Sequence, residues 1–165
     1  MKKRAGTWFG EKVKADGYTF DSKKEYDFYR KFIKDCGYRF EVHPNFSLHD
    51  TFKVVGRDIN IRSSRYTPDF VIYDSDNSIK HVYDLKNSFT SYAIDQAAAL
   101  RFKWFAWRYG IPVEVVVPRA HDFKIKILGI TKRFNPVTRL DVDYDLDEMI
   151  EEALSKKKED ENGEG

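Results

Sequence analysis

The chain has 165 residues, which is enough for one domain and too few for a multidomain enzyme. Hydrophobic residues make up 41% of it and aromatic residues 16%, so the composition excludes a wholly disordered or fibrous chain. The net charge of +2 is unevenly divided: residues 141–165 hold 11 acidic residues and 3 lysines, a net of −8, and residues 1–140 therefore carry +10. A basic body of this size predicts a polyanionic partner, with nucleic acid as the first candidate.

The first part of the chain predicts a basic arm over residues 1–17, followed by a helix that begins at Asp21 or Ser22 and runs to about Lys34. Apolar side chains recur at helical spacing and define its buried face: Phe28, Tyr29, Phe32 and Ile33. Glu25 precedes these residues by helical intervals, so it is expected on or beside the core-facing side.

Residues 38–48 have the alternating, aromatic character of a strand, and the proline inside it favours a place near a sheet edge. Residues 49–65 predict a basic excursion with a short hairpin around Gly56. Two further strands, 66–73 and 79–86, are joined by a polar turn and predict an antiparallel hairpin.

The register of this hairpin decides whether two carboxylates meet. If Tyr73 pairs with Ile79, Asp69 lies opposite Tyr83, whereas a shift by one residue sets Asp69 opposite Asp84. The pattern alone leaves both registers open.

The remaining elements complete an α/β fold. A helix is predicted over residues 91–109, with Gly110 as its end, and a buried strand over 113–117, which together indicate a right-handed crossover in a mixed sheet. Residues 123–130 predict another strand and 146–158 a terminal helix. We therefore divide the chain into the basic arm (1–17), one α/β domain (18–140) and an acidic helix and tail (141–165), the last serving as a solubilising tail.

Two classes of protein are excluded by what the sequence lacks. The single cysteine, Cys36, allows no internal disulfide or multi-cysteine zinc site and fits a reducing compartment. No apolar run approaches the roughly 18 to 20 residues of a membrane span, and the first ten residues lack the apolar stretch of a secretory signal. We expect no membrane partner and no export.

The pattern that carries chemistry lies on the hairpin. Asp84 and Lys86 are two residues apart on a strand and point to the same face. In the favourable register Asp69 stands about 5 Å from Asp84 at the Cβ atoms, and a bound divalent cation is one way to offset the repulsion between the two carboxylates. Glu25 would supply a further oxygen from its helix.

These motifs resemble a known group of enzymes. The blocks Phe20-Asp21-Ser22-Lys23-Lys24-Glu25, Tyr66-Thr67-Pro68-Asp69-Phe70 and Asp84-Leu85-Lys86, in this order, resemble the PD-(D/E)xK nuclease superfamily and its restriction-endonuclease-like core. They are more specifically similar to small phage-encoded endonucleases laid out like phage Holliday-junction resolvases, and the resemblance spans residues 17–117. Two positions depart from the usual pattern: Asn87 stands where such proteins usually have Gly, and His43 where a Gln is common.

The resemblance implies roles for four residues. Asp69 and Asp84 would bind Mg²⁺ or Mn²⁺, Glu25 would bind metal or position water, and Lys86 would orient the attacking water and offset charge on the phosphate. It also implies DNA as partner, a homodimer by analogy with resolvases, and a phage-encoded protein in the cytoplasm of a bacterial host. We expect a metal-dependent endodeoxyribonuclease acting on branched or junction DNA.

Each of these residues also has a structural interpretation, and other functions stay open. Glu25 with Ser22 fits a capping box, Asp69 after Pro68 fits a turn, and Asp84 with Lys86 fits a solvated strand face. The alternatives for function are a nicking or structure-insensitive nuclease, a nuclease acting on RNA, and a DNA-binding accessory protein without catalysis.

Contacts to the DNA backbone are predicted for basic and polar residues in several segments: Lys2, Lys3, Arg4, Lys23, Arg57, Arg62, Arg65, Gln96 and Lys103. The histidines are scattered, which predicts surface or structural roles for them: His43, His49, His81 and His121. The aromatic residues Trp104, Phe105, Trp107 and Tyr109 are expected in the core or at a subunit interface.

Overall fold

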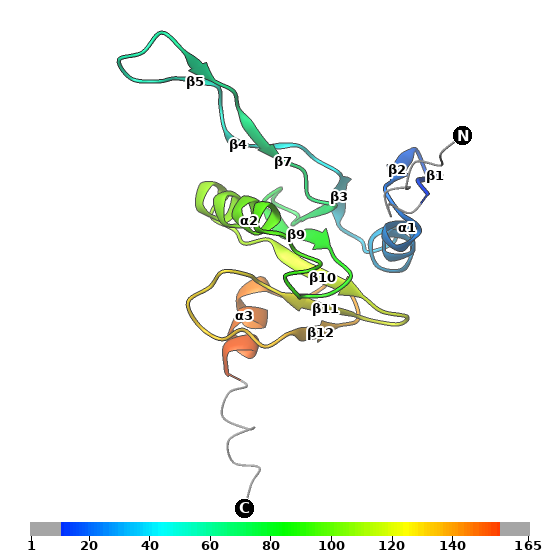
Figure 1. The fold of residues 1–165 in the computed structure, drawn as a ribbon. Coiled ribbons are helices and arrows are strands. Elements are labelled where there is room, and N and C mark those ends of the chain that lie inside the picture. The colour runs from blue at the N-terminus through cyan, green and yellow to red at the C-terminus, as the bar shows by residue number, and fades with distance from the viewer. Residues whose placement is uncertain (1–10, 156–165) are drawn as a thin grey trace, which may run out of the picture.

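The computed structural model describes residues 11–155, which form a mixed α/β fold around a six-stranded sheet (Figure 1). Its strands are β3 (Arg39–Val42), β8 (Phe70–Tyr73), β9 (Ile79–Leu85), β10 (Glu114–Pro118), β11 (Phe123–Lys126) and β12 (Val137–Arg139). Their spatial order is β12-β11-β10-β9-β8-β3, in which β9 and β10 are parallel and the other neighbours antiparallel. The predicted α/β class is confirmed, and so is the edge position of the strand after the first helix.

Side chains of the sheet alternate between two separate hydrophobic cores, one on each face. Phe70 and Ile72 point to one face, whereas Val71 and Tyr73 point to the other. The first face is covered by α1 (Lys23–Phe28), the π-helix η1 (Tyr29–Ile33) and α3 (Leu146–Ser155), and the second by α2 (Gln96–Tyr109). In Figure 1, α1 and α2 accordingly lie on opposite sides of the sheet.

The first helix forms as predicted but in two parts, α1 and η1. Ser22 is its N-cap, with the side chain accepting a hydrogen bond from the Glu25 N–H at 3.1 Å. Gly37, at φ 82°, lies in the turn beyond η1. Phe28 and Tyr29 are buried on the expected face, and Glu25 is buried beside them.

The β8–β9 hairpin contains both of the registers that the sequence leaves open. Phe70 pairs with Tyr83, and this register continues until a bulge brings Tyr73 opposite Ile79. At the end of the hairpin nearest α1, the Asp69 N–H donates to the Tyr83 carbonyl at 3.0 Å. The bulge therefore accommodates the turn without separating Asp69 from the Asp84 end of β9.

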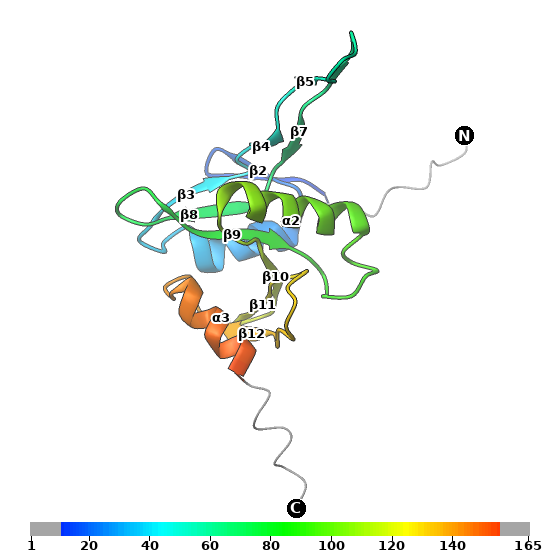
Figure 2. The same ribbon diagram turned by 90° about the vertical axis from the view of Figure 1, so that its left-hand side faces the viewer.

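A long β-ribbon, residues 46–66, projects away from the sheet (Figure 2), and we call it the β-arm. Its base is β4 (Phe46–His49) paired with β7 (Ser64–Tyr66), and its outer part is β5 (Phe52–Lys53) paired with β6 (Asn60–Ile61). The predicted hairpin around Gly56 is thus the tip of this arm.

Helix α2 begins five residues later than the predicted start at Ser91. Asp95 caps it by accepting a hydrogen bond from the Ala98 N–H at 2.7 Å, and this cap leaves residues 88–95 as a loop. The helix ends at Gly110, which has φ 69°, as predicted. Because α2 connects parallel β9 to β10, the predicted crossover is present.

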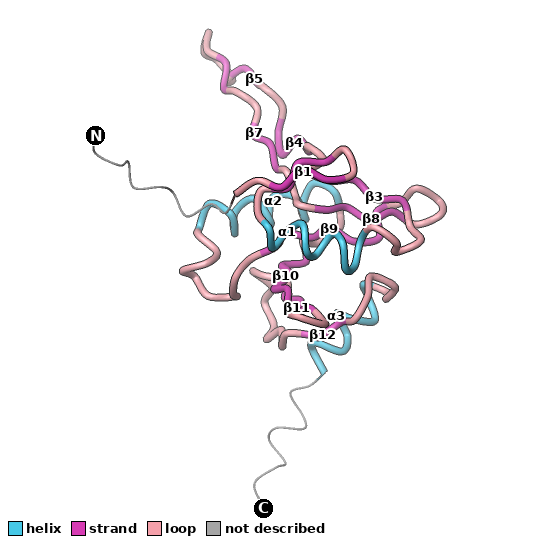
Figure 3. The backbone as a smooth tube through the Cα atoms, turned by 90° about the vertical axis from the view of Figure 1, so that its right-hand side faces the viewer, coloured by secondary structure: helices cyan, strands magenta, loops and turns pink. Residues whose placement is uncertain are grey.

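Both ends of the described chain belong to the folded body (Figure 3). Residues 11–17, assigned to the basic arm on sequence, contain β1 (Val13–Ala15), which pairs with β2 (Tyr18–Phe20). Met149 and Ala153 of α3 are fully buried in the core beneath α1, so the folded domain extends past residue 140. Lys2, Lys3 and Arg4 and residues 156–165 lie outside the described residues. No helix in residues 11–155 is long and apolar enough to cross a membrane.

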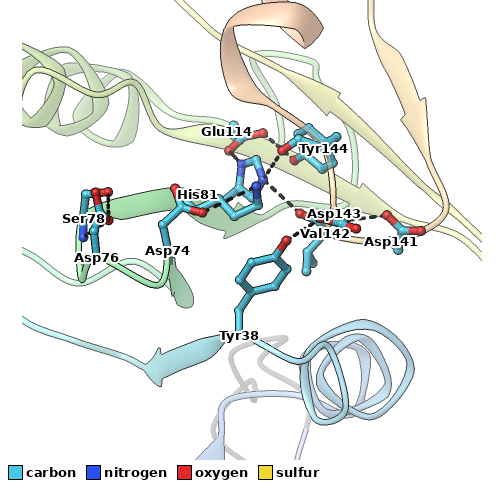
Figure 4. A network of polar contacts seen from close by, with 11 residues as sticks. Tyr38, Asp74, Asp76, Ser78, His81, Glu114, Asp141, Val142, Asp143 and Tyr144 are labelled. Atoms are coloured by element: carbon cyan, nitrogen blue, oxygen red, sulfur yellow. Dashed lines mark hydrogen bonds and ion pairs between the residues drawn. The ribbon is translucent and has the colours of Figure 1, made fainter.

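A buried polar network ties the segment before α3 to the sheet (Figure 4). Nδ1 of His81 lies 2.7 Å from Oε2 of Glu114, and both side chains are fully buried. Nε2 of His81 faces the carbonyl oxygens of Val142 and Tyr144 at 3.1 and 3.0 Å, so this nitrogen carries a proton. His81 thus has the structural role expected for it.

Two tyrosine hydroxyls complete this network. Tyr144 donates to Oε1 of Glu114, and the Tyr83 hydroxyl lies 2.8 Å from the Tyr144 hydroxyl. Burial raises the pKa of both tyrosines well above the ordinary value, so both stay protonated, and Tyr83 therefore donates to Tyr144. Both side-chain oxygens of Glu114 have a hydrogen-bond partner, which explains how an acidic residue occupies a buried strand.

Candidate active site

A cleft of about 780 Å³ lies where the start of α1, the ends of β7 and β9 and the first turns of α2 come together. Four acidic residues line it: Asp21, Glu25, Asp69 and Asp84. Five cationic residues line it as well: Lys12, Lys24, Arg65, Lys86 and Arg101. Glu25 and Asp84 are buried, whereas Lys12, Arg65 and Arg101 are exposed, so the cleft has an acidic floor and a basic rim.

Asp69 enters the floor at the start of β8. Its Oδ2 accepts a hydrogen bond from the Leu85 N–H at 2.7 Å, which holds the carboxylate against the end of β9. Burial, followed by the charges of Asp84 and Glu25, raises the pKa of Asp69 well above its ordinary value. A bound cation would therefore stabilise the charged form of the Asp69 carboxylate.

Asp84 and Lys86 point into the cleft from the same face of β9, as their spacing predicts. Nζ of Lys86 lies 3.1 Å from Oδ1 of Asp84, and the buried Tyr66 hydroxyl donates to Oδ2 at 2.8 Å. Asp84 is therefore held from both sides, and it holds the Lys86 ammonium in turn. Tyr66, to which the sequence motif assigns no role of its own, acts here as a positioning residue.

Glu25 contacts a histidine, His43, that is not itself among the residues lining the cleft. Nε2 of His43 lies 2.6 Å from Oε1 of Glu25 but is not aligned for a hydrogen bond, and neither atom has a hydrogen-bond partner among the described residues. The Glu25 carboxylate raises the pKa of the His43 imidazole above its ordinary value. Because Oε1 of Glu25 is buried and free of the helix cap, a purely structural capping role does not account for it.

These side chains form a group that could hold a metal ion. One ligand atom each from Asp21, Glu25, His43 and Asp69 lies within 4.8 Å of the others. The orphaned, buried Oε1 of Glu25 fits a cation ligand, since a bound ion would satisfy it. The group contains Glu25 and Asp69, as expected, and adds Asp21 and His43, whereas the oxygens of Asp84 are already engaged by Tyr66 and Lys86.

Comparison with known proteins gives a match to a protein family. Residues 6–117 match the model of a family described as "Protein of unknown function (DUF1064)". The chain belongs to this family. Neither the curated proteins nor the solved structures gave a match. The matched range contains every residue that lines the cleft, whereas β11, β12 and α3 lie beyond it, so the cleft belongs to the part that DUF1064 members share.

In this DUF1064 chain, the other predicted site residues fall in different places. Arg65 lines the cleft, Arg57 and Arg62 lie on the β-arm, and Lys23 lines a neighbouring hollow on α1. That hollow shares Lys24 with the cleft, so the two are adjacent.

Gln96 and Lys103 are not brought to the cleft. Among the described residues, α2 contributes Ala98, Arg101 and Phe102, and the Lys103 side chain packs over Gly129 instead. Ala98, Arg101 and Phe102 share a helix face at intervals of three and four residues, and the burial of Ala98 and Phe102 is what turns Arg101 toward the cleft.

Sequence reasoning also missed Lys24 and the part played by Asn87. Nζ of Lys24 donates to the Lys86 carbonyl at 3.2 Å and to Oδ1 of Asn87 at 2.9 Å. Partial burial lowers the pKa of Lys24 below its ordinary value. The Asn at this position therefore has a function in the structure, because its side chain fixes a second lysine beside Lys86.

The aromatic side chains of α2 divide between two environments. Phe105 is buried as expected, but Trp107 is 82% exposed, and Leu100 and Trp104 are exposed on the same side of the helix. The core interpretation is therefore wrong for Trp107. An exposed apolar stripe, Leu100–Trp104–Trp107, remains available to a partner.

Proposed function

We propose that the protein is a metal-dependent endodeoxyribonuclease, encoded by a phage and acting in the cytoplasm of its host, that hydrolyses DNA phosphodiesters at branched or junction structures. The observation that carries this proposal is the cleft floor, in which the carboxylates of Glu25, Asp69 and Asp84 lie beside Lys86 beneath a rim of exposed cations. A carboxylate cluster alone would repel a phosphodiester, whereas the rim attracts one.

The residues of the cleft can divide the reaction between them. A bound Mg²⁺ or Mn²⁺ would polarise a phosphoryl oxygen and lower the pKa of water. Glu25 and Asp69 would hold the ion through hard oxygen ligands, with Asp84 adjacent. The Lys86 ammonium, oriented by Asp84, would position the attacking water and stabilise the charge that develops on the phosphate.

The β-arm carries arginine side chains from the cleft outward, where DNA could contact them. Arg65 lies at its base in the cleft, and Arg62 and Arg57 follow further out. From residue 47 to residue 56 the chain reaches at most about 30 Å, close to one turn of duplex. We propose that these arginines contact phosphates of the duplex that flanks the cleavage site.

The double substitution Arg57→Gln/Arg62→Gln is expected to weaken DNA binding and to make the negative slope of log K against log salt shallower by about 1.8, because two phosphate contacts are lost. Fluorescence anisotropy at several salt concentrations measures this slope. The matched control is Lys132→Gln/Arg133→Gln, which removes two exposed charges from the loop between β11 and β12. An unchanged slope in the arm variant would show that the β-arm does not contact DNA.

We propose that the second subunit of a homodimer contacts the Leu100–Trp104–Trp107 stripe. These exposed side chains follow one face of α2 at intervals of four and three residues, as a self-complementary contact would require. Paired incision of a four-way junction needs two active sites, so sedimentation should show a dimer.

The assay that tests the proposed function compares labelled four-way junction, flap and linear duplex, each with Mg²⁺, Mn²⁺ or a chelator. Paired, metal-dependent cuts confined to the junction are the expected result. Equal cutting of all three substrates would retain a nuclease without structure preference, and single cuts would identify a nicking enzyme. Tight binding without any cutting would identify an accessory protein, and preferential cutting of an RNA hairpin would change the substrate class.

A further inference from the structure

The His43 imidazole has no role in the chemistry proposed above, yet it faces three carboxylates of the cleft. Its Nε2 lies 2.6 Å from Oε1 of Glu25, 3.7 Å from Oδ2 of Asp21 and 3.9 Å from Oδ1 of Asp69. One imidazole can balance the charge of only one carboxylate, so an ion pair alone does not explain why three carboxylates surround this nitrogen.

The backbone of His43 is held in an unfavourable conformation. Its φ of 52° lies in the left-handed region, which is uncommon for a residue with a Cβ, and Pro44 restricts the residue before it further. The His43 N–H donates to the Asp69 carbonyl at 3.0 Å, which holds this turn at the end of β3. Strained backbone of this kind concentrates at functional sites, where it aims a side chain.

The contact between His43 and Glu25 is close but is not a hydrogen bond. Oε1 of Glu25 and Nε2 of His43 are buried, and neither finds a hydrogen-bond partner among the described residues. The Glu25 side chain is only 6% exposed. Two buried polar atoms, 2.6 Å apart and without an aligned hydrogen bond, fit a shared cation that binds both of them.

We propose that Nε2 of His43 is a metal ligand together with Glu25 and Asp69, and that the site therefore selects a first-row transition ion such as Mn²⁺ or Co²⁺ over Mg²⁺. Imidazole nitrogen is a poor ligand for Mg²⁺, which keeps oxygen ligands and water, whereas affinity for a nitrogen donor rises along the first transition row. This inference rests on the proposed function only in taking the cleft as a metal site, and it does not depend on DNA cleavage.

Calorimetric titration of the full chain with Mg²⁺, Mn²⁺ and Co²⁺, without DNA, tests the selectivity. Wild type should bind Mn²⁺ at least about tenfold more tightly than Mg²⁺, and Co²⁺ more tightly still. His43→Gln offers an oxygen in place of the nitrogen, so it should lose about tenfold or more in affinity for Mn²⁺ and Co²⁺ and change little for Mg²⁺. An equal loss for all three ions would overturn the proposal.

Pulsed electron paramagnetic resonance of the Mn²⁺-loaded protein reads the ligand directly. Wild type should show nitrogen hyperfine coupling that His43→Gln abolishes and that His49→Gln, a control histidine outside the possible metal group, retains. If His43→Gln does not fold, wild type labelled with ¹⁵N-histidine decides through its shifted coupling. Absence of nitrogen coupling in a protein that cleaves DNA would overturn this inference alone, whereas nitrogen coupling in a protein that never cleaves DNA would overturn only the nuclease.

Discussion

Replacing Asp84 by Asn is expected to reduce the rate of metal-dependent DNA cleavage by about a thousandfold or more, because electrostatic stabilisation by a metal site is worth several kcal/mol in the transition state. Asn retains the shape of the side chain and can still accept the hydrogen bond from Tyr66. It removes the charge that holds Lys86 and adjoins the metal group. DNA affinity should be retained, since the substitution removes a negative charge from a cleft with a basic rim.

Single-turnover cleavage of the junction, together with anisotropy in chelator, separates the two effects. Asp35→Asn is the matched control, because Asp35 is exposed and does not line the cleft. If Asp84→Asn is poorly folded by circular dichroism, Lys86→Ala replaces it, since Lys86 is partly exposed and at the same site. Full metal-dependent activity in both variants would contradict the assignment of the active site.

The hairpin that carries Asp69 and Asp84 is predictable from sequence because its signals are local. A polar turn between two β-rich segments is enough to pair the strands. The strand register is harder to predict from the sequence, because the bulge next to Tyr73 depends on how the turn closes. The same holds for α2, where Asp95 ends the loop by capping the helix, although residues 91–95 are compatible with either state.

The participation of His43 could not be predicted in this way. The residue is 18 positions from Glu25 and 26 from Asp69 in the sequence, and its side chain is aimed by a left-handed backbone that the Asp69 carbonyl holds in place. The same argument covers Arg101, because only the burial of the neighbouring α2 residues decides which face of the helix meets the cleft. Tertiary packing therefore completes a site that local patterns outline.

Replacing Glu114 by Leu is expected to lower the free energy of unfolding by about 3 to 5 kcal/mol, since it breaks a buried, hydrogen-bonded charge network from one side. The substitution leaves Nδ1 of His81 and the Tyr144 hydroxyl without their acceptor in the core. Urea unfolding at neutral pH measures the loss. Glu151→Leu, an exposed position on α3, is the control and should change stability by less than about 0.5 kcal/mol.

The double variant His81→Leu/Glu114→Leu tests whether the two residues act as one unit. In Glu114→Leu alone, the His81 imidazole is left in the core without its acceptor, and the double variant removes that imidazole. The double variant should therefore lose at least about 1 kcal/mol less stability than the sum of the losses in His81→Leu and Glu114→Leu. Additive losses would show that the contact between His81 and Glu114 does not couple them.

Glu114 and Asp84 lie on opposite faces of the sheet. Glu114 is two residues from Val116 on β10 and so points to the α1 and α3 side, whereas Asp84 is two residues from Val82 on β9 and so points to the α2 side. Cleavage per folded molecule should consequently stay at the wild-type level in the double variant, and a fall in that rate would mean that this network acts on the cleft across the sheet.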